Sequence, residues 1–210
     1  MSENDAIPQL QMIWPAHLLD TPPAVELAPG YTIRTYRPGD EDRFYALMDL
    51  AGWPGWDAER LHIPLNRILP DGWFMAIHQR SNEIVATAMS IHNGKGRYPF
   101  QGVLGWVAGD PAHAGQGLGK SVVAAATARL IRVGYRDISL YTEDFRLSAL
   151  KIYLSFGYVP LLYTPDMPAR WQTICKKVGH LFTPEPWMAA KAAWEAIRRD
   201  AGGDAGQAYH

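Results

Sequence analysis

Three glycines alternate with other residues in the segment 114–121, directly before a stretch with helical spacing. Gly115, Gly117 and Gly119 allow the backbone to approach a ligand closely and to adopt conformations that other residues avoid. The N–H groups at the start of a helix, together with the helix dipole, favour a phosphate or pyrophosphate. This loop is therefore a candidate anion site, to which Lys120 either adds a charge or stays solvated.

The same loop almost reproduces the nucleotide-binding P-loop. Gly119-Lys120-Ser121 supplies the required ending, but Ala114 stands where the first glycine should be. The strand of a P-loop also feeds almost directly into its glycines, whereas residues 110–113 intervene here. The motif lies past the middle of the chain, and no clear acidic metal ligand ends a later apolar strand. A P-loop nucleotide-binding protein is the second hypothesis for this loop.

A phenol lies on a second segment, residues 146–158, which has helical spacing and ends in Gly157 and Tyr158. Tyr153 follows Ala149 by four residues, so that both lie on one face of a helix. A phenol with a pKa near ~10 can donate its proton to a thiolate of comparable basicity. Tyr153 is the candidate catalytic residue; the alternative is a core aromatic residue.

Taken together, the two segments resemble the GNAT superfamily of N-acetyltransferases, over residues 31–163. Its first motif is a strand, a Pro-containing turn and [QR]-x-x-G-x-[GA], which Ala114-Gly115-Gln116-Gly117-Leu118-Gly119 occupies with Ala114 at the usual Gln or Arg position. Its second motif is N-x-x-A-x-x-x-Y with a closing glycine and aromatic residue, and here Arg146 replaces the Asn.

The resemblance implies an N-acetyltransferase that moves an acetyl group from acetyl-CoA, as co-substrate, directly to an amine of a small molecule or peptide. It implies Tyr153 as the acid at the departing sulfur, and it implies no metal. The residues that it assigns to the cofactor are Val107, Ala108, Gly109, Ala114, Gly115, Gln116, Gly117, Leu118, Gly119, Lys120, Ser121, Arg146 and Ala149.

The general base stays open, because the strand 101–109 contains no acid where many relatives place a Glu. The candidates are Asp110, His113, Glu143 and Asp144. A water relay is a further route for the proton. The missing base and the departures at Ala114 and Arg146 motivate a third, non-enzymatic hypothesis, a degenerate GNAT domain that binds acyl-CoA.

Other reactive residue types favour structural roles. The single cysteine, Cys175, has no paired His and is expected to be a buried hydrophobe. His62, His78 and His92 lack metal-ligand spacing. The segment 53–56, Trp-Pro-Gly-Trp, lies between two early helices. In the family this region borders the acceptor site, which suggests an apolar or aromatic acceptor.

The elements that must position these residues follow from periodicity and from Pro and Gly signals. Strands are expected at 31–36, 73–78, 84–92, 103–109, 138–142 and 158–163. Helices are expected at 41–52, 57–68, 118–133, 147–156, 170–178 and 185–199. The fold class is a single α/β GNAT-like domain, with a mixed, mostly antiparallel sheet, a splayed parallel strand pair and flanking helices. Its parts are an extended arm (1–30), the domain (31–165), a helical extension (166–200) and a flexible tail (201–210).

Composition excludes several classes of protein. The 210 residues contain 20 Lys and Arg against 21 Asp and Glu, and this net charge of −1 argues against a nucleic-acid binder. The sequence shows no basic leader and no apolar stretch of the roughly 20 residues that a spanning helix needs, so a cytoplasmic protein without a membrane partner is expected. The sequence leaves open the identity of the acceptor and the length of the acyl group. It also leaves open whether the arm and the last helix contribute to a homodimer.

Overall fold

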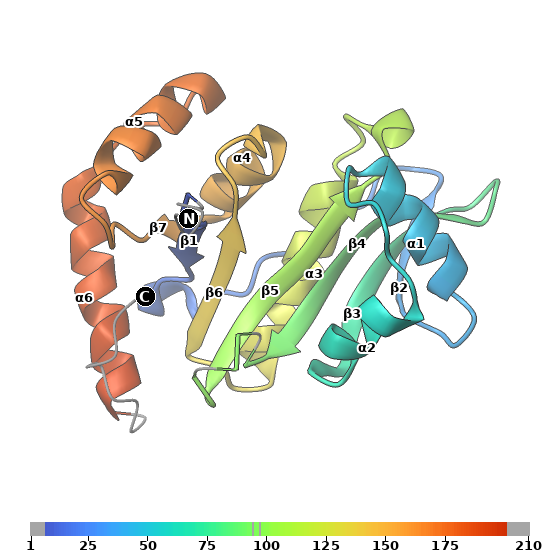
Figure 1. The fold of residues 1–210 in the computed structure, drawn as a ribbon, viewed down its shortest axis with the longest axis horizontal. Helices are drawn as coiled ribbons and strands as arrows, with labels where there is room; N and C mark the ends of the chain where they lie inside the picture. Colours follow the sequence, from blue (N-terminus) through green and yellow to red (C-terminus); the bar gives the residue numbers. More distant parts are fainter. Residues whose placement is uncertain (1–6, 94, 97, 201–210) are drawn as a thin grey trace, which may run out of the picture.

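The computed structural model describes residues 7–93, 95–96 and 98–200, so the predicted flexible tail, residues 201–210, lies outside the described residues. A twisted sheet forms the centre of the molecule (Figure 1). Its strands, in the order β2-β3-β4-β5-β6-β1-β7, are β1 Leu10–Ile13, β2 Tyr31–Thr35, β3 Ile68–His78, β4 Glu83–His92, β5 Gln101–Gly109, β6 Asp137–Thr142 and β7 Val159–Pro160. Neighbouring strands are antiparallel except β5 and β6, which are parallel.

The helices begin and end close to the predicted positions: α1 Glu41–Leu50, α2 Ala58–Leu65, α3 Leu118–Arg132, α4 Leu147–Phe156, α5 Met167–Val178 and α6 Pro184–Asp200. Local chemistry explains several of these ends. The Asp57 side chain accepts a hydrogen bond from the Arg60 N–H at 2.8 Å and so caps α2. Gly157 ends α4 in the left-handed conformation with φ +91°. Helix α2 is shorter than predicted, because Ile68 already belongs to β3.

Helices cover both faces of the sheet (Figure 1). On one face Phe44 and Met48 of α1 pack with Trp73 and Met75 of β3. On the other face α3 contributes Val122, Ala126 and Leu130 to a cluster with Ala88 and Leu104. Strand β5 therefore lies between two apolar layers, as predicted for a central strand.

The N-terminal strand lies inside the sheet, between β6 and β7. Leu10 pairs with Thr142 of β6, and Ile13 pairs with Val159 of β7. An extended arm was expected here, but this strand was not predicted. All four residues of β1 are buried, Gln11 included, as is typical of a strand inside a sheet that is covered on both faces. The last strand is shorter than the predicted 158–163, and its Pro160 has no N–H to donate to a ladder.

The C-terminal helix is fixed to the beginning of β6. Asp137 accepts hydrogen bonds from Trp194 Nε1 and from Arg198 Nε, both at 2.7 Å. The Arg198 guanidinium also lies 3.7 Å from the ring centre of Tyr98, which precedes β5. Helix α6 thereby holds the paired ends of β5 and β6 together.

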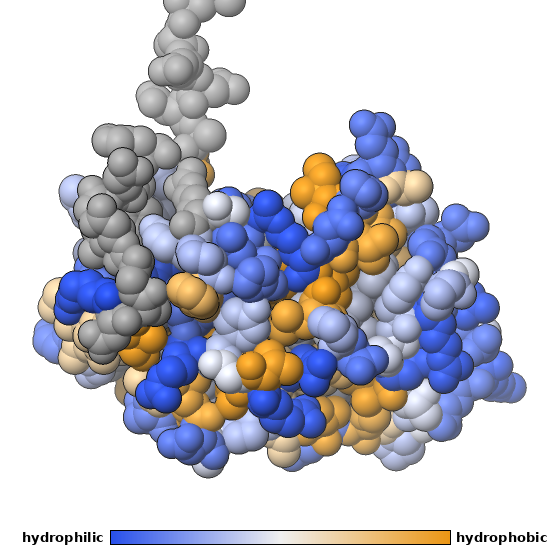
Figure 2. All heavy atoms as spheres, turned by 90° about the horizontal axis from the view of Figure 1, so that it is seen from below, coloured by the Kyte–Doolittle hydropathy of each residue, from blue (hydrophilic) through white to orange (hydrophobic). Residues whose placement is uncertain are grey.

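Apolar side chains reach the surface at several places among mostly polar ones (Figure 2). Among the helices that the structure describes, none combines the length and the apolar character needed to cross a bilayer.

Candidate active site

The parallel strands β5 and β6 separate part-way along their length. They pair from Gln101 and Asp137 to Leu104 and Leu140. Beyond these positions β5 stays paired with β4 up to Gly109, while β6 is paired with β1. The predicted splayed pair is confirmed, and β1 contributes to it by holding the end of β6 away from β5.

A bulge in β5 lies at the point where the strands separate. The register between β4 and β5 shifts between Thr87 and Met89, and Trp106 has φ +50°, which is rare for a bulky residue. Its ring packs against Trp56 with centroids 4.6 Å apart and against Trp53 at 5.6 Å. The bulge thus turns one side of the opening into an aromatic wall.

A cavity of about 590 Å³ occupies the gap between the separated strands. The predicted site residues that line it are Val107, Ala108, Gly109, Arg146, Ala149 and Tyr153. The strand that precedes the glycine loop and the segment of the second motif therefore meet at this cavity.

Tyr153 lines this cavity and is only 5% exposed. Its burial raises the pKa of the phenol, because the charged phenolate is disfavoured away from water. The positive charge of Arg146 lowers this pKa, and the negative charge of Glu143 raises it. The net shift is upward, so Tyr153 keeps its proton at neutral pH.

Two charged residues, Glu143 and Arg146, line the cavity together with Trp53. Arg146 Nε donates to Glu143 Oε2 at 2.6 Å, and the Arg146 guanidinium lies 3.6 Å from the Trp53 ring centre. Within the described part of the chain, Glu143 is the one carboxylate among the residues that line the cavity.

The glycine loop has the backbone conformation that the sequence predicted. Gly115 has φ +81° and Gly117 has φ +75°, and a Cβ added to either would meet nothing within 4 Å. Gly117 is the residue directly before α3. A Cβ on Gly119, in contrast, would lie 2.9 Å from Ile152 Cδ1 of α4. The first two glycines leave space for a ligand, and the third allows α3 to approach α4.

A second cavity, of about 600 Å³, lies between the glycine loop and the N-terminal segment. Gln116, Gly117, Lys120 and Ser121 line it from the loop. Residues between Trp14 and Ala28 line it from the opposite side. The Ser121 hydroxyl donates to the Glu26 carbonyl oxygen, so that the N-terminal segment is fastened to α3.

The other predicted loop residues, Ala114, Gly115, Leu118 and Gly119, line neither of these two cavities. Leu118 is 4% exposed and packs in the core. Contacts of all of these residues with a cofactor remain predictions.

The four candidates for the general base have different surroundings in the structure. Asp110 accepts a hydrogen bond from the Ala112 N–H at 2.8 Å, and His113 Nδ1 lies 2.8 Å from the Tyr31 hydroxyl. Asp144 receives two hydrogen bonds from Arg170. None of these three lines the cavity between β5 and β6, whereas Glu143 does.

Sequence reasoning missed several lining residues. Trp106 was not predicted, since a bulge in an apolar strand has no sequence signal other than Gly105, whose added Cβ would lie 2.6 Å from Ile91 Cδ1. Gln9 reaches the cavity only because β1 enters the sheet. Cys175 is 1% exposed, which agrees with the expected buried role.

Residues 36–158 match the family model described as the acetyltransferase (GNAT) family. The chain belongs to this family. The glycine loop is thus the first GNAT motif, which supersedes the P-loop hypothesis.

Curated relatives of the chain are mycothiol acetyltransferases. The protein from Thermobispora bispora is 31% identical over 153 residues, which cover 67% of this chain and 50% of the relative. That from Sanguibacter keddieii is 28% identical, over 70% of this chain and 51% of the relative. The chain spans about half the length of these relatives.

Solved structures share the fold. A GCN5-related N-acetyltransferase from Sphaerobacter thermophilus superposes with a TM-score of 0.58 at 25% identity, covering 73% of this chain and 49% of the other. The ribosomal-protein-S18-alanine N-acetyltransferase of Escherichia coli gives 0.50 at 20% identity, covering 60% and 76%. The diaminobutyrate acetyltransferase of Paenibacillus lautus, in complex with its substrate and coenzyme A, gives 0.50 at 18%, covering 63% and 75%. The predicted fold class is confirmed.

Proposed function

We propose that this protein transfers an acetyl group from acetyl-CoA to an amine of a small molecule. The observation that carries the proposal is the position of Tyr153, which lines the cavity between the separated strands β5 and β6. The same cavity is lined by residues 107–109 at the end of β5 and by Glu143. A proton donor, a strand edge and a carboxylate therefore face one space.

The residues present fit acetyl-CoA, which supplies an acetyl group activated as a thioester. Past Leu104 the edge of β5 that faces β6 is no longer paired with β6, so it offers N–H and C=O groups to a pantetheine arm. The loop at Gly115 and Gly117 has positive φ and open space, as a pyrophosphate cradle needs. The second cavity adjoins this loop and suits the rest of the nucleotide.

Three groups of this chain would then carry the reaction. Glu143, directly or through a water, accepts a proton from the incoming ammonium. A backbone N–H near the bulge polarises the acetyl carbonyl as the nitrogen attacks the carbon. The new C–N bond forms while the C–S bond breaks, and Tyr153 donates its proton to the departing sulfur. The nitrogen then loses its second proton, which restores the Tyr153 hydroxyl, and Glu143 releases the proton it accepted to solvent. The products are the acetylated amine and the free CoA thiol. No enzyme thiol is needed, in keeping with the burial of Cys175.

The acceptor end favours a small amine with an apolar portion. Trp53 and Trp106 form an aromatic wall beside the Glu143–Arg146 ion pair. The curated relatives are named mycothiol acetyltransferases, which supports a small-molecule acceptor. Saturation-transfer NMR with a bound amine should show contacts at Trp53, and their absence would remove the aromatic wall from acceptor binding.

The test separates the proposal from its alternatives. Calorimetry should show binding of acetyl-CoA and no binding of Mg·ATP. Release of free CoA thiol should then depend on an added amine, measured with a panel of primary amines. Binding of acetyl-CoA without amine-dependent thiol release would favour the third hypothesis, a degenerate domain that only binds acyl-CoA.

A further inference from the structure

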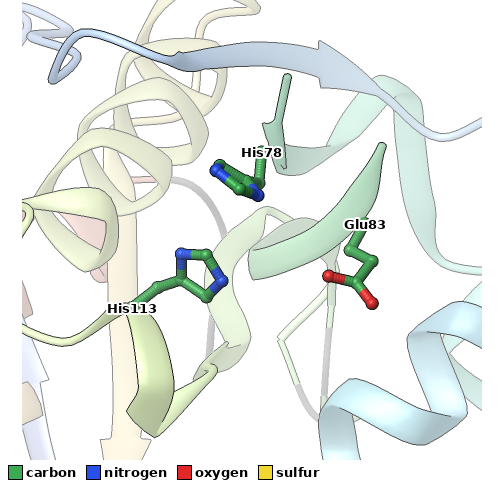
Figure 3. A group of neighbouring side chains, drawn as sticks. All are labelled: His78, Glu83 and His113. Carbon is green, nitrogen blue, oxygen red and sulfur yellow. The ribbon is translucent and has the colours of Figure 1, made fainter. Parts of the chain in front are cut away.

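Three metal-ligating side chains from separate segments meet beside the glycine loop (Figure 3). His78 is the last residue of β3, Glu83 is the first residue of β4, and His113 ends the 3₁₀ turn Pro111–His113. One ligand atom from each lies within 4.8 Å of the other two. The two imidazole rings have centroids 4.9 Å apart.

Hydrogen bonds orient both imidazole rings. His113 Nδ1 lies 2.8 Å from the Tyr31 hydroxyl, and His78 Nδ1 lies 2.9 Å from the Ser81 hydroxyl. The Tyr31 ring also packs against both imidazoles, with centroids 5.4 Å and 5.7 Å away. A hydroxyl that accepts the Nδ1–H leaves Nε2 with a lone pair for a metal ion, and such outer partners are typical of metal-binding histidines.

The ligand set and its size suit zinc. Two imidazole nitrogens and one carboxylate are ligands that Zn²⁺ prefers, and a water can occupy the fourth position. Zinc bonds of about 2.0–2.2 Å place tetrahedral ligand atoms about 3.4 Å apart. The ligand atoms, which lie within 4.8 Å of one another, would have to move closer together to bind the ion. Glu83 is exposed and has the freedom to make this movement.

We propose that His78, Glu83 and His113 bind one Zn²⁺ ion that joins the β3–β4 hairpin to the glycine loop. His113 lies two residues before Gly115, so the ion would fix the start of the segment that forms the anion site. None of the three residues lines either cavity beside that loop. The ion therefore has a structural role, separate from the chemistry of acetyl transfer. Sequence spacing did not reveal this site, because its ligands meet only in the fold.

Calorimetric titration of the tag-free, EDTA-treated full chain with ZnCl₂ tests the proposal. The wild-type protein should bind one ion per chain. Loss of a residue that hydrogen-bonds a metal ligand typically weakens metal binding roughly 10- to 100-fold. Tyr31→Phe removes such a residue and should weaken zinc binding about 10-fold. His113→Ala and Glu83→Gln each remove a ligand itself and should weaken zinc binding at least as much. His92→Ala is the matched control, since His92 Nδ1 also pairs with a tyrosine hydroxyl, that of Tyr135 at 2.6 Å, but His92 is not part of the cluster.

Thermal melting provides a second measurement that does not depend on enzyme activity. Zn²⁺ at about 100 times its Kd should raise the Tm of the wild-type and His92→Ala proteins by about 5–10 °C. At the same Zn²⁺ concentration the Tm of His113→Ala should rise by clearly less than that of the wild-type protein, because its sites are filled only in part. Absence of zinc binding by the wild-type protein would overturn the proposal, and so would a wild-type zinc affinity in both His113→Ala and Glu83→Gln. Acetyl-CoA binding in EDTA is measured separately, so failure of the zinc site leaves the proposed function untouched.

Discussion

The guanidinium of Arg146 lies over the ring of Trp53, with its central carbon 3.6 Å from the ring centre. This contact connects the residue before α4 to the loop between α1 and α2, and both residues line the cavity between β5 and β6. Arg146 also forms an ion pair with Glu143 at 2.6 Å. The replacement of the family's usual Asn by Arg146 thus creates a contact that holds the Trp53 side of the cavity.

Replacing Arg146 by Asn should raise the KM for the amine about 5- to 30-fold. The change removes a cation–π contact of about 1–2 kcal/mol that orients Trp53. Steady-state kinetics with varied amine and saturating acetyl-CoA measures the effect. Arg60→Asn is the control, because the Arg60 guanidinium lies 4.9 Å from the ring centre of Trp56 and is not among the cavity residues. Equal KM values for both variants would contradict a role of the Arg146–Trp53 contact.

Tyr153→Phe should lower kcat by about 10²- to 10⁴-fold and leave the Kd for acetyl-CoA nearly unchanged, since it removes only the proton donor. Tyr158→Phe is the matched control. Tyr158 is also buried and its hydroxyl is 2.9 Å from that of Thr127, but it does not line the cavity. Tyr158→Phe should therefore cost about 1 kcal/mol of stability and little turnover. An unchanged kcat in Tyr153→Phe would exclude Tyr153 as the acid.

Glu143→Gln should reduce kcat/KM for the amine by about 10²-fold or more, because the cavity then lacks its carboxylate. Asp144→Asn tests the neighbouring carboxylate, which is paired with Arg170 outside the cavity. This second variant should change stability more than turnover. The pH dependence of kcat/KM for both variants is the measurement, and a larger kinetic loss in Asp144→Asn would contradict the assignment of Glu143.

Gly117→Ala should weaken acetyl-CoA binding about 10-fold. Its φ of +75° is strained for alanine by about 1–2 kcal/mol, so the loop would shift away from its cradle geometry. Gly134→Ala imposes similar strain, with φ +94°, beyond the other end of the same helix. Calorimetry should show weaker acetyl-CoA binding for Gly117→Ala than for Gly134→Ala, although both variants should lose a similar amount of stability. Equal affinities would show that the loop conformation does not matter for binding.

Asp40→Asn should reduce the amount by which the free energy of unfolding falls when the solution is acidified. Hydrogen bonds from Arg34, at 2.6 Å and 2.8 Å, and from the Arg37 N–H hold the pKa of Asp40 below its ordinary value. The folded pKa lies below the unfolded one. The ionised Asp40 therefore contributes about 1–2 kcal/mol to the free energy of unfolding. This contribution is fully present above the unfolded pKa of ~3.9, and it is lost as the pH falls through the folded pKa.

Urea unfolding between pH 2.5 and 7 measures this effect. The wild-type protein should lose more stability than Asp40→Asn over the acidic range. Asp42→Asn, an exposed change in the first turn of the same helix, should follow the wild-type curve. Parallel curves for all three proteins would rule out the Arg34–Asp40 pair as a source of acid sensitivity.

Local patterns were sufficient to predict much of the fold and one half of the site. Helix α4 was predicted with its observed bounds, because apolar spacing and Gly157 define it within a few residues. The positive φ of Gly115 and Gly117 follows from the loop's own sequence. These features depend on residues that are neighbours in the chain. The glycine loop and the helix with Tyr153 also follow one another in the order that the GNAT family shows.

Features that depend on distant partners were not predictable in this way. Strand β1 pairs Leu10 with Thr142, more than a hundred residues away, and its own four residues have no distinguishing pattern. The bulge at Trp106 exists because β4 fixes the register on the other side of β5. The preference for Glu143 over Asp144 also needed the structure, since Glu143 lines the cavity whereas Asp144 is paired with Arg170.

Mass-spectrometric detection of the acetylated amine, with isotopically labelled acetyl-CoA and a panel of primary amines, tests acetyl transfer most directly. The label should appear on the amine nitrogen with wild-type protein and with Tyr158→Phe, and should be lost almost completely with Tyr153→Phe. A protein that binds acetyl-CoA but never transfers the label, or transfers it equally well without the Tyr153 hydroxyl, would contradict the proposal.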